Sequence, residues 1–205
     1  RASRRPRQPP PTMRNRAIAA QHGRSAWHHP SPVPDFRFCP LCATALQPIP
    51  AGRPDAGRPA CPRGHFVHYD NPAVTVFAFV RDARGRYLVL ERAREPFFAQ
   101  WDLPGGFVEA GETPEQAIRR ELREETGLEV EVERILGAFA SRYGDDRWTV
   151  DVGYECRLVG DPAALRLDAE KSDAAWLPLD RLPRLAFDGE RAGLAVLRGA
   201  PVEGA

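Results

Sequence analysis

The chain has 205 residues, of which 42% are hydrophobic and 28% charged, and its formal net charge is +1. That much apolar sequence can bury the core of one globular domain, which excludes a protein that is disordered throughout. No apolar run exceeds the eight residues from Ala73 to Val80, which is too short for a membrane-spanning helix. The small net charge conceals two oppositely charged regions, because residues 1–38 carry +7 and the remaining 167 residues carry −6.

Residues 1–35 are expected to form a disordered, basic, proline-rich tail. Thirteen of the 21 prolines lie in the first 62 residues, with no helical or strand periodicity around them. Three interpretations of the tail stay open: an extension upstream of a start at Met13, an arginine-rich transit peptide, or an arm that touches nucleic acid. The first is favoured, since no amphipathic apolar face supports the second.

Strand and helix patterns begin after Asn71-Pro72. Short segments rich in β-branched and aromatic residues predict strands at 73–81, 87–90, 101–103, 129–139, 148–158 and 176–177. A helix is predicted over 113–126, because Thr113 and Gln116 form a capping box and Gly127 follows as a stop signal. A second helix is predicted at 188–197. The sequence therefore predicts a mixed α/β layered domain over 73–198, followed by a C-terminal tail at 199–205.

The first predicted helix carries a crowded acidic face. Glu121, Glu124 and Glu125 are spaced i, i+3 and i+4, and Glu112 lies just before the helix. Like charges at this spacing repel, and carboxylates in the last turn oppose the helix dipole. A divalent cation such as Mg²⁺ would favour such a cluster of oxygen ligands, whereas the alternative is a solvated acidic surface.

The segment from Gly106, GFVEAGETPEQAIRRELREETGL, resembles the Nudix box, G-x5-E-x7-R-E-U-x-E-E-x-G-U, in which U is a bulky aliphatic residue. The matched positions are Gly106, Glu112, Arg120, Glu121, Leu122, Glu124, Glu125, Gly127 and Leu128. The chain is identified on these residues as a member of the Nudix hydrolase family. The resemblance implies an α/β/α sandwich with a mixed sheet, and an enzyme that hydrolyses derivatives of nucleoside diphosphates.

The resemblance also implies a metal site for Mg²⁺ or Mn²⁺. Glu121 and Glu125 are the implied principal ligands, Glu124 is a further ligand or a water contact, and the carbonyl of Gly106 completes the set. Such cations would neutralise the diphosphate and activate a water molecule. An acidic domain that binds an acidic substrate needs cations between the two.

Supporting and catalytic roles are implied for further residues. By resemblance, Glu112 supports the metal site and Arg120 holds the carboxylates by ion pairing. Many family members also place a carboxylate in a loop before a late tryptophan. Glu170 stands six residues before Trp176 and is expected in that role, with Asp173 as the alternative.

The region 36–72 is expected to form a small zinc ribbon. Cys39 and Cys42 form a C-x2-C knuckle, and Cys61 and His65 form a C-x3-H knuckle, which together offer a Cys3His ligand set for structural Zn²⁺. The stretch resembles the ribbon that precedes Nudix domains related to NADH pyrophosphatase, except that a glycine replaces the usual fourth cysteine. His68 is the alternative fourth ligand, and free thiols in a loop are the alternative to a metal site.

The substrate is less sharply indicated. The segment 137–145 lacks the SQPWPFPxS motif of NADH pyrophosphatases, so ADP-ribose or another nucleotide sugar is favoured. Arg92, Phe97, Tyr143 and Phe187 are candidate substrate contacts. The alternatives are hydrolysis of NAD(H), an RNA cap or a dinucleoside polyphosphate, and a non-catalytic sensor of ADP-ribose-like ligands.

Further expectations concern partners and composition. A small-molecule nucleotide is the expected partner, with nucleic acid possible but not favoured and no membrane. A homodimer is expected by resemblance, in the cytoplasm. Lys171 is the only lysine among 29 basic residues, which we attribute to coding composition and not to chemistry.

Overall fold

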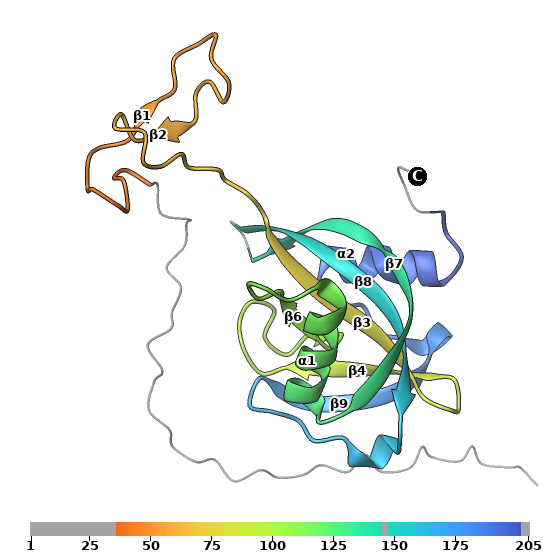
Figure 1. Cartoon of the computed structure of the whole chain (residues 1–205). Coiled ribbons are helices and arrows are strands. Elements are labelled where there is room, and N and C mark those ends of the chain that lie inside the picture. The colour runs from red at the N-terminus through yellow and green to blue at the C-terminus, as the bar shows by residue number, and fades with distance from the viewer. Residues whose placement is uncertain (1–35, 145–146, 202–205) are drawn as a thin grey trace, which may run out of the picture. The chain divides into compact units, whose positions relative to one another are not determined.

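The computed structural model describes residues 36–144 and 147–201 (Figure 1). The tail expected at 1–35, and residues 202–205 of the tail expected at 199–205, lie outside the described residues. The strands are β1 (Gln47–Pro48), β2 (Pro59–Ala60), β3 (Ala73–Arg81), β4 (Arg86–Arg92), β5 (Trp101–Asp102), β6 (Gly105–Phe107), β7 (Glu129–Tyr143), β8 (Arg147–Val159) and β9 (Lys171–Pro178). The helices are α1 (Pro114–Thr126), α2 (Asp188–Leu197) and the one-turn 3-10 helices η1 (Pro162–Ala164) and η2 (Leu179–Arg181). None of the helices in this part of the chain is long and apolar enough to cross a lipid bilayer.

The main sheet has seven strands and mixes parallel and antiparallel pairs. Its strand order is β5-β4-β3-β8-β7, with β6 paired to β3 and β9 paired to β4. Strand β8 runs parallel to β3 over the whole length of β3, from Ala73 opposite Thr149 to Arg81 opposite Arg157. The other pairs in this sheet are antiparallel, so the mixed sheet expected from the sequence is confirmed.

Strand β3 supplies both faces of the sheet with core residues, because successive side chains alternate. Val76, Ala78 and Val80 pack in one cluster with Ile118 and Leu122 of α1, and all five are at most 2% exposed.

The intervening residues of β3 face the opposite side. Phe77 and Phe79 pack there with Leu136 of β7 and Leu194 of α2. Figure 1 shows α1 and α2 covering opposite faces of the sheet, so the expected α/β/α sandwich is confirmed.

Helix α1 begins and ends where its local sequence signals predict. The Thr113 hydroxyl accepts from the Gln116 backbone N–H at 3.3 Å, and the Thr113 N–H donates to the Gln116 side chain at 2.7 Å. Gly127 ends the helix in the left-handed conformation, at φ 66°. These signals at the two ends of α1 determine which residues of the acidic face share one turn.

Two strands differ from the sequence-based expectation. Residues 105–107 form β6, where only the end of a strand was expected, because they pair with Val76 and its neighbours in β3. Strand β9 begins at Lys171 and not near Trp176, because it pairs with β4 along the whole of that length. Its exposed polar positions conceal the strand in the sequence.

Residues 36–72 have almost no interior. A two-stranded antiparallel sheet joins β1 to β2, with Gln47 opposite Ala60. Only Cys39 and Cys61 are buried among these residues, whereas Phe38 and Leu41 are 61% and 72% exposed. Apolar burial therefore contributes little to the fold of this region.

Candidate active site

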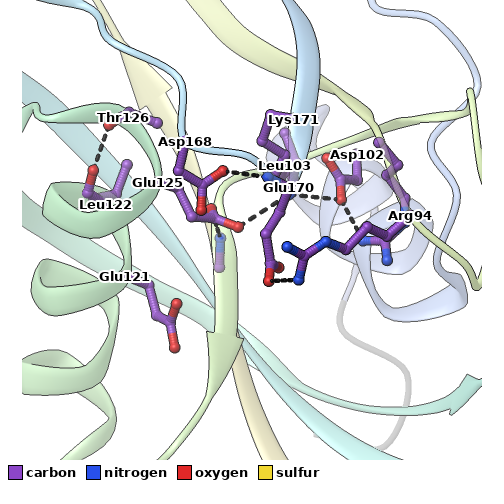
Figure 2. Close-up of polar contacts among 12 residues, drawn as sticks. Arg94, Asp102, Leu103, Glu121, Leu122, Glu125, Thr126, Asp168, Glu170 and Lys171 are labelled. Carbon is purple, nitrogen blue, oxygen red and sulfur yellow. Dashed lines mark hydrogen bonds and ion pairs between the residues drawn. The ribbon is translucent and has the colours of Figure 1, made fainter. Parts of the chain in front are cut away.

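Glu125 is the most deeply buried carboxylate of the acidic helix face. It is 6% exposed, and its Oε2 accepts from the Gly105 N–H at 3.0 Å while Lys171 Nζ lies 3.0 Å from its Oε1. Figure 2 shows Glu125 pointing from α1 toward Lys171. Burial raises the pKa of Glu125 to about 8, although Lys171 and the Gly105 N–H act in the opposite direction.

Two glycines bring β6 close to its neighbours. A Cβ on Gly105 would lie 2.1 Å from the Val76 carbonyl oxygen, and a Cβ on Gly106 would lie 2.4 Å from Glu121 Oε1. Backbone atoms block a side chain at Gly105, so glycine is required there, whereas a side chain at Gly106 would displace the Glu121 carboxylate. The Glu121 carboxylate therefore lies directly over the backbone of Gly106. Burial raises the pKa of Glu121, and Arg120 opposes that shift.

Arg120 lies among three carboxylates of the Nudix-like segment. Its guanidinium nitrogens are 2.7 Å from Glu112, 2.8 Å from Glu121 and 3.1 Å from Glu124, and one donates to the Phe107 carbonyl at 3.0 Å. The hydrogen bond with Glu112 is the largest contribution that raises the pKa of Arg120 and lowers that of Glu112. Mutual repulsion among these acids is thus offset by an internal cation.

The chemistry of this donor set fits a hard divalent cation. Glu121, Glu124 and Glu125 offer only oxygen atoms, as Mg²⁺ and Mn²⁺ prefer. In the described residues these carboxylates are not gathered as a metal-binding group, and they pair instead with Arg120 and Lys171. The Glu121 carboxylate lies against the backbone of Gly106, where a Cβ would clash with it.

The two candidates for a late carboxylate differ in their surroundings. The Glu170 side chain is 53% exposed and lies 2.6 Å from Arg94. Figure 2 shows Glu170 next to Lys171, with its carboxylate directed toward Arg94. Asp173 instead accepts the N–H of Ala174 and lies opposite Glu91 in the β4–β9 pair. Of the two, Glu170 is the one adjacent in sequence to a contact of Glu125.

The four candidate substrate contacts come together beside the acidic face. Tyr143 and Phe187 stack with centroids 5.8 Å apart and planes 10° apart, and Phe97 meets Phe187 edge-on at 5.1 Å. The Arg92 guanidinium lies 5.0 Å from the centroid of Phe187. Phe107, which the sequence analysis did not select, meets Tyr143 edge-on at 5.4 Å. We call Phe97, Phe107, Tyr143 and Phe187 the aromatic wall.

The loop that carries Phe97 has an unusual backbone. Phe97 and Ala99 both adopt positive φ, at 66° and 59°. Non-glycine residues seldom hold this conformation unless the surrounding structure enforces it, and such positions cluster at functional sites. Arg92 enforces it here, because its side chain donates to the Pro96 carbonyl at 2.7 Å and its own carbonyl accepts the Ala99 N–H at 2.9 Å.

Lys171 is the functional-site residue that the sequence analysis missed. Its side chain is 3% exposed, and its Nζ lies 3.0 Å from both Glu125 and Asp102. Burial alone would lower the pKa of Lys171, but the two carboxylates outweigh burial and the net shift is upward. The signal was present in the sequence, since this is the one lysine in a chain that otherwise uses arginine.

A second ligand cluster lies in residues 36–72. Ligand atoms of Cys39, Cys42, Cys61 and His65 all lie within 4.8 Å of one another. The Cys42 and Cys61 sulfur atoms are 3.6 Å apart, far beyond a disulfide bond of about 2.05 Å. Two thiolates on a tetrahedral Zn²⁺ with bonds of about 2.3 Å would stand about 3.8 Å apart. His68 instead stacks on a phenylalanine ring, with centroids 4.5 Å apart.

Comparison with known proteins identifies the family. The model of the NUDIX domain family matches residues 71–196. The ADP-ribose pyrophosphatase of Methanocaldococcus jannaschii is 36% identical over 124 residues, which cover 60% of this chain and 72% of that protein. The chain belongs to the Nudix family. Relatives named for hydrolytic activities include this ADP-ribose pyrophosphatase, and we refer to the chain below as a Nudix hydrolase.

Two further matches extend this result. The NAD-capped RNA hydrolase NudC of Chromobacterium violaceum is 34% identical over 154 residues, 73% of this chain, and the match covers about half (52%) of that relative. A crystal structure of a NUDIX hydrolase from Nitrosomonas europaea superposes with a TM-score of 0.66 at 25% identity, covering 80% of this chain and 94% of the other. The Nudix fold of this chain is therefore shared with a solved structure.

Proposed function

We propose that this Nudix hydrolase cleaves the diphosphate linkage of ADP-ribose or a similar nucleotide sugar, in a reaction that requires Mg²⁺ or Mn²⁺. The observation that carries the proposal is that strand β6 contacts both the acidic residues and the aromatic wall. Gly106 faces the Glu121 carboxylate, and the next residue, Phe107, packs against Tyr143 of the aromatic wall. A ligand with a diphosphate near the carboxylates would thus have an aromatic surface beside it for its base or sugar.

The proposed metal ligands are Glu121 and Glu125, with Glu124 and the Gly106 carbonyl as further oxygen donors. When bound, the cation supplies neutralisation of the diphosphate charge and activation of water. The chain's own residues orient the ligands, because Arg120 pairs with both Glu121 and Glu124 on α1. The donor chemistry and the position of the Glu121 carboxylate against the Gly106 backbone support this assignment.

Catalytic roles are proposed for residues around these ligands. Glu170 is proposed to orient the attacking water and accept its proton on the carboxylate, because it is exposed and next to the Lys171 that contacts Glu125. Glu124 is 59% exposed and is proposed to contact the water or the cation. Arg120 and Glu112 are proposed to hold the carboxylates by their 2.7 Å ion pair and its neighbours.

The aromatic wall is proposed to bind the nucleoside. Tyr143 and Phe187 present nearly parallel rings, and purine bases stack on such surfaces. Arg92 lies over the Phe187 ring and is proposed to contact the ligand from the same side, with Phe97 at the edge. The 36% identical ADP-ribose pyrophosphatase supports a substrate with adenine and ribose attached to a diphosphate.

A structural Zn²⁺ is proposed at Cys39, Cys42, Cys61 and His65. The support is the close approach of the four ligand atoms and the lack of an apolar interior in residues 36–72. All described cysteines are free thiols, which fits a reducing compartment, so a cytoplasmic location is part of the proposal. The homodimer expected from the family resemblance stays a prediction.

A second candidate is hydrolysis of NAD(H) or of NAD-capped RNA. It is favoured by the match to the NudC relative over 154 residues, which is longer than the NUDIX domain match at 71–196. The absence of the SQPWPFPxS motif from segment 137–145 weighs against it. The two candidates share the acidic site and differ in what the aromatic wall would bind.

The test is a substrate panel with Mg²⁺ or Mn²⁺ that measures the released mononucleotide. The panel contains ADP-ribose, nucleotide sugars, NADH and NAD-capped RNA. We expect metal-dependent cleavage that is fastest with ADP-ribose or a nucleotide sugar. Glu125→Gln should lower turnover by at least about 100-fold, whereas Glu115→Gln, an exposed acid on the same helix, should retain wild-type turnover. Wild-type turnover in Glu125→Gln would refute the assignment of this ligand.

A further inference from the structure

A continuous chain of buried charges joins the acidic residues to the aromatic wall. Glu125 contacts Lys171 at 3.0 Å, Lys171 contacts Asp102 at 3.0 Å, and Asp102 contacts Arg92 at 2.7 Å. Their side chains are 8%, 3%, 2% and 12% exposed, in that order. Arg92 then lies over the ring of Phe187. We call Glu125, Lys171, Asp102 and Arg92 the ion chain.

The ion chain alternates carboxyl groups with cationic side chains, so each member lies next to a group of the opposite type. Buried charges are tolerated when each has an opposite partner, and removing one leaves another buried without compensation. Each inner member here has two partners, since Lys171 bridges two carboxylates and Asp102 Oδ2 accepts from both Lys171 and Arg92. Displacement of any one member therefore affects the next.

The single lysine of the sequence stands at the centre of this chain. One nitrogen atom lies at 3.0 Å from two carboxylates that come from different segments, α1 and β5. An ammonium is a compact point charge that can bridge in this way, whereas a guanidinium is planar and wider. The need for one compact charge between two carboxylates is therefore a geometric reason for lysine at this position, where the rest of the protein uses arginine.

We propose that Lys171 is a positioning residue, which fixes Glu125 in the acidic site and, through Asp102, fixes Arg92 over the aromatic wall. This inference rests on the proposed function, in which Glu125 ligates the cation and Arg92 contacts the substrate. Both oxygens of Glu125 are held from outside α1, one by Lys171 and one by the Gly105 N–H, so its carboxylate has a defined orientation. Partners that orient a metal ligand in this way tune the affinity for the metal.

The backbone supports the same link. The carbonyl of Glu170, the residue before Lys171, accepts the N–H of Ala93, the residue after Arg92, at 2.8 Å. Lys171 also lies opposite Arg92 in the pairing of β9 with β4. The two cations of the ion chain are therefore held on adjacent strands, and Asp102 lies on β5, which also pairs with β4.

The first test measures binding of Mn²⁺ alone, by electron paramagnetic resonance of the free ion. Lys171→Met should weaken Mn²⁺ binding by about tenfold or more. The matched control is Arg86→Met, which removes the cation partner, at 2.6 Å, of another buried carboxylate, Asp82, on the hairpin between β3 and β4. Both variants should lower the melting temperature, but Arg86→Met should bind Mn²⁺ like the wild type. Unchanged or tighter Mn²⁺ binding in Lys171→Met would overturn the proposal.

The second test measures the link to the aromatic wall. The dissociation constant is measured for a non-hydrolysable analogue of ADP-ribose at an Mn²⁺ concentration that saturates each variant, so that no turnover occurs and differences in Mn²⁺ affinity make no contribution. Lys171→Met and Arg92→Met should each weaken this binding, and the double variant should weaken it no further than Arg92→Met alone. Fully additive losses would show that the two residues act independently and would refute the coupling.

Two further variants cover the case in which Lys171→Met does not fold, and separate this proposal from the proposed function. If Lys171→Met does not fold, Lys171→Arg keeps the charge with the wrong shape, and it should fold yet still weaken Mn²⁺ binding. Wild-type Mn²⁺ affinity in Lys171→Arg would then count against positioning. Glu125→Gln separates the two proposals. If it binds Mn²⁺ like the wild type, the proposed function fails; if it loses Mn²⁺ while the Lys171 variants do not, only the role of Lys171 fails.

Discussion

The two candidate metal sites of this protein differ in what holds their ligands in place. In the region 36–72, the only buried residues are Cys39 and Cys61, which are themselves two of the four ligands. In the Nudix domain, the acidic residues lie on a helix whose opposite side is anchored by the fully buried Ile118 and Leu122. We therefore expect the first site to depend on the proposed metal for its fold, whereas the second is held by an apolar core.

The two sites also differ in their counterions. The acidic residues are paired with cationic side chains of the protein itself. Arg120 pairs with Glu121, and Lys171 pairs with Glu125. The thiols of the ribbon have no arginine or lysine partner among the described ion pairs; Cys42 meets Thr44, Cys61 and His65. Internal cations let a cluster of acids stay ordered before a substrate and its metal arrive. We expect a cluster of thiols without such cations to need the proposed metal to stay folded.

Removal of zinc should have the largest effect, and it should be confined to one region. Cys61→Ser, or a strong chelator, should unfold residues 36–72, because metal binding supplies about 10 kcal/mol or more in small zinc modules. Trypsin should then cleave rapidly at Arg37 and Arg63, while α1 and the sheet stay resistant. A ribbon that resists trypsin without metal would contradict this contrast between the sites.

The fourth zinc ligand gives a sharper version of the same test. His65→Ala should weaken zinc binding, because its ring nitrogen lies with the three sulfur atoms. His68→Ala is the matched control and should leave zinc affinity unchanged, since its ring stacks on Phe36 instead. Zinc affinity is measured by competition with a chromogenic chelator. The reverse ranking of the two variants would assign His68 as the ligand.

Loss of core packing should destabilise the Nudix domain and not residues 36–72. Leu122→Ala removes a fully buried side chain from α1 and should lower the free energy of unfolding by about 2–5 kcal/mol. Leu41→Ala, in the ribbon, removes a side chain that is 72% exposed and should change it by no more than about 0.5 kcal/mol. Urea denaturation monitored by circular dichroism measures both. Equal effects would show that the ribbon has a packed interior after all.

The parts of this structure that the sequence predicted are those set by local signals. The bounds of α1 follow from Thr113, Gln116 and Gly127, which lie within or beside the helix. The acidic residues share one face because helical spacing alone places them there. The close grouping of Cys39, Cys42, Cys61 and His65 follows from two short knuckles joined by one hairpin.

The parts that escaped prediction depend on contacts between distant segments. Lys171 and Asp102 are 69 residues apart, and no periodicity in either segment indicates that they meet. Phe107 becomes part of the aromatic wall only because β6 pairs with β3 and brings it to Tyr143 at the end of β7. Tertiary pairing of this kind is decided by the whole sheet and leaves no local signature.

A substitution in the aromatic wall should have a smaller effect, on substrate binding and not on the stability of the protein. Phe187→Ala should raise the KM for ADP-ribose by about tenfold with little change in kcat, because one base–aromatic stack contributes about 1–3 kcal/mol. The matched control is Phe98→Ala, an exposed aromatic on the neighbouring loop that makes no recorded ring contact with the wall. Steady-state kinetics measures both. A loss confined to kcat in Phe187→Ala would place this ring at the reacting phosphate instead.

The smallest predicted effect comes from the cap of α1. Thr113→Ala should lower the free energy of unfolding by about 1 kcal/mol, because it leaves the first helical N–H groups without a side-chain acceptor. The loss should appear equally with and without added zinc, since α1 draws its stability from its own ends and from the core below it. Urea denaturation in the presence of zinc and of a chelator measures this. A cap effect that depends on zinc would show that the ribbon contributes to the stability of the acidic helix, and the two regions would no longer count as independent.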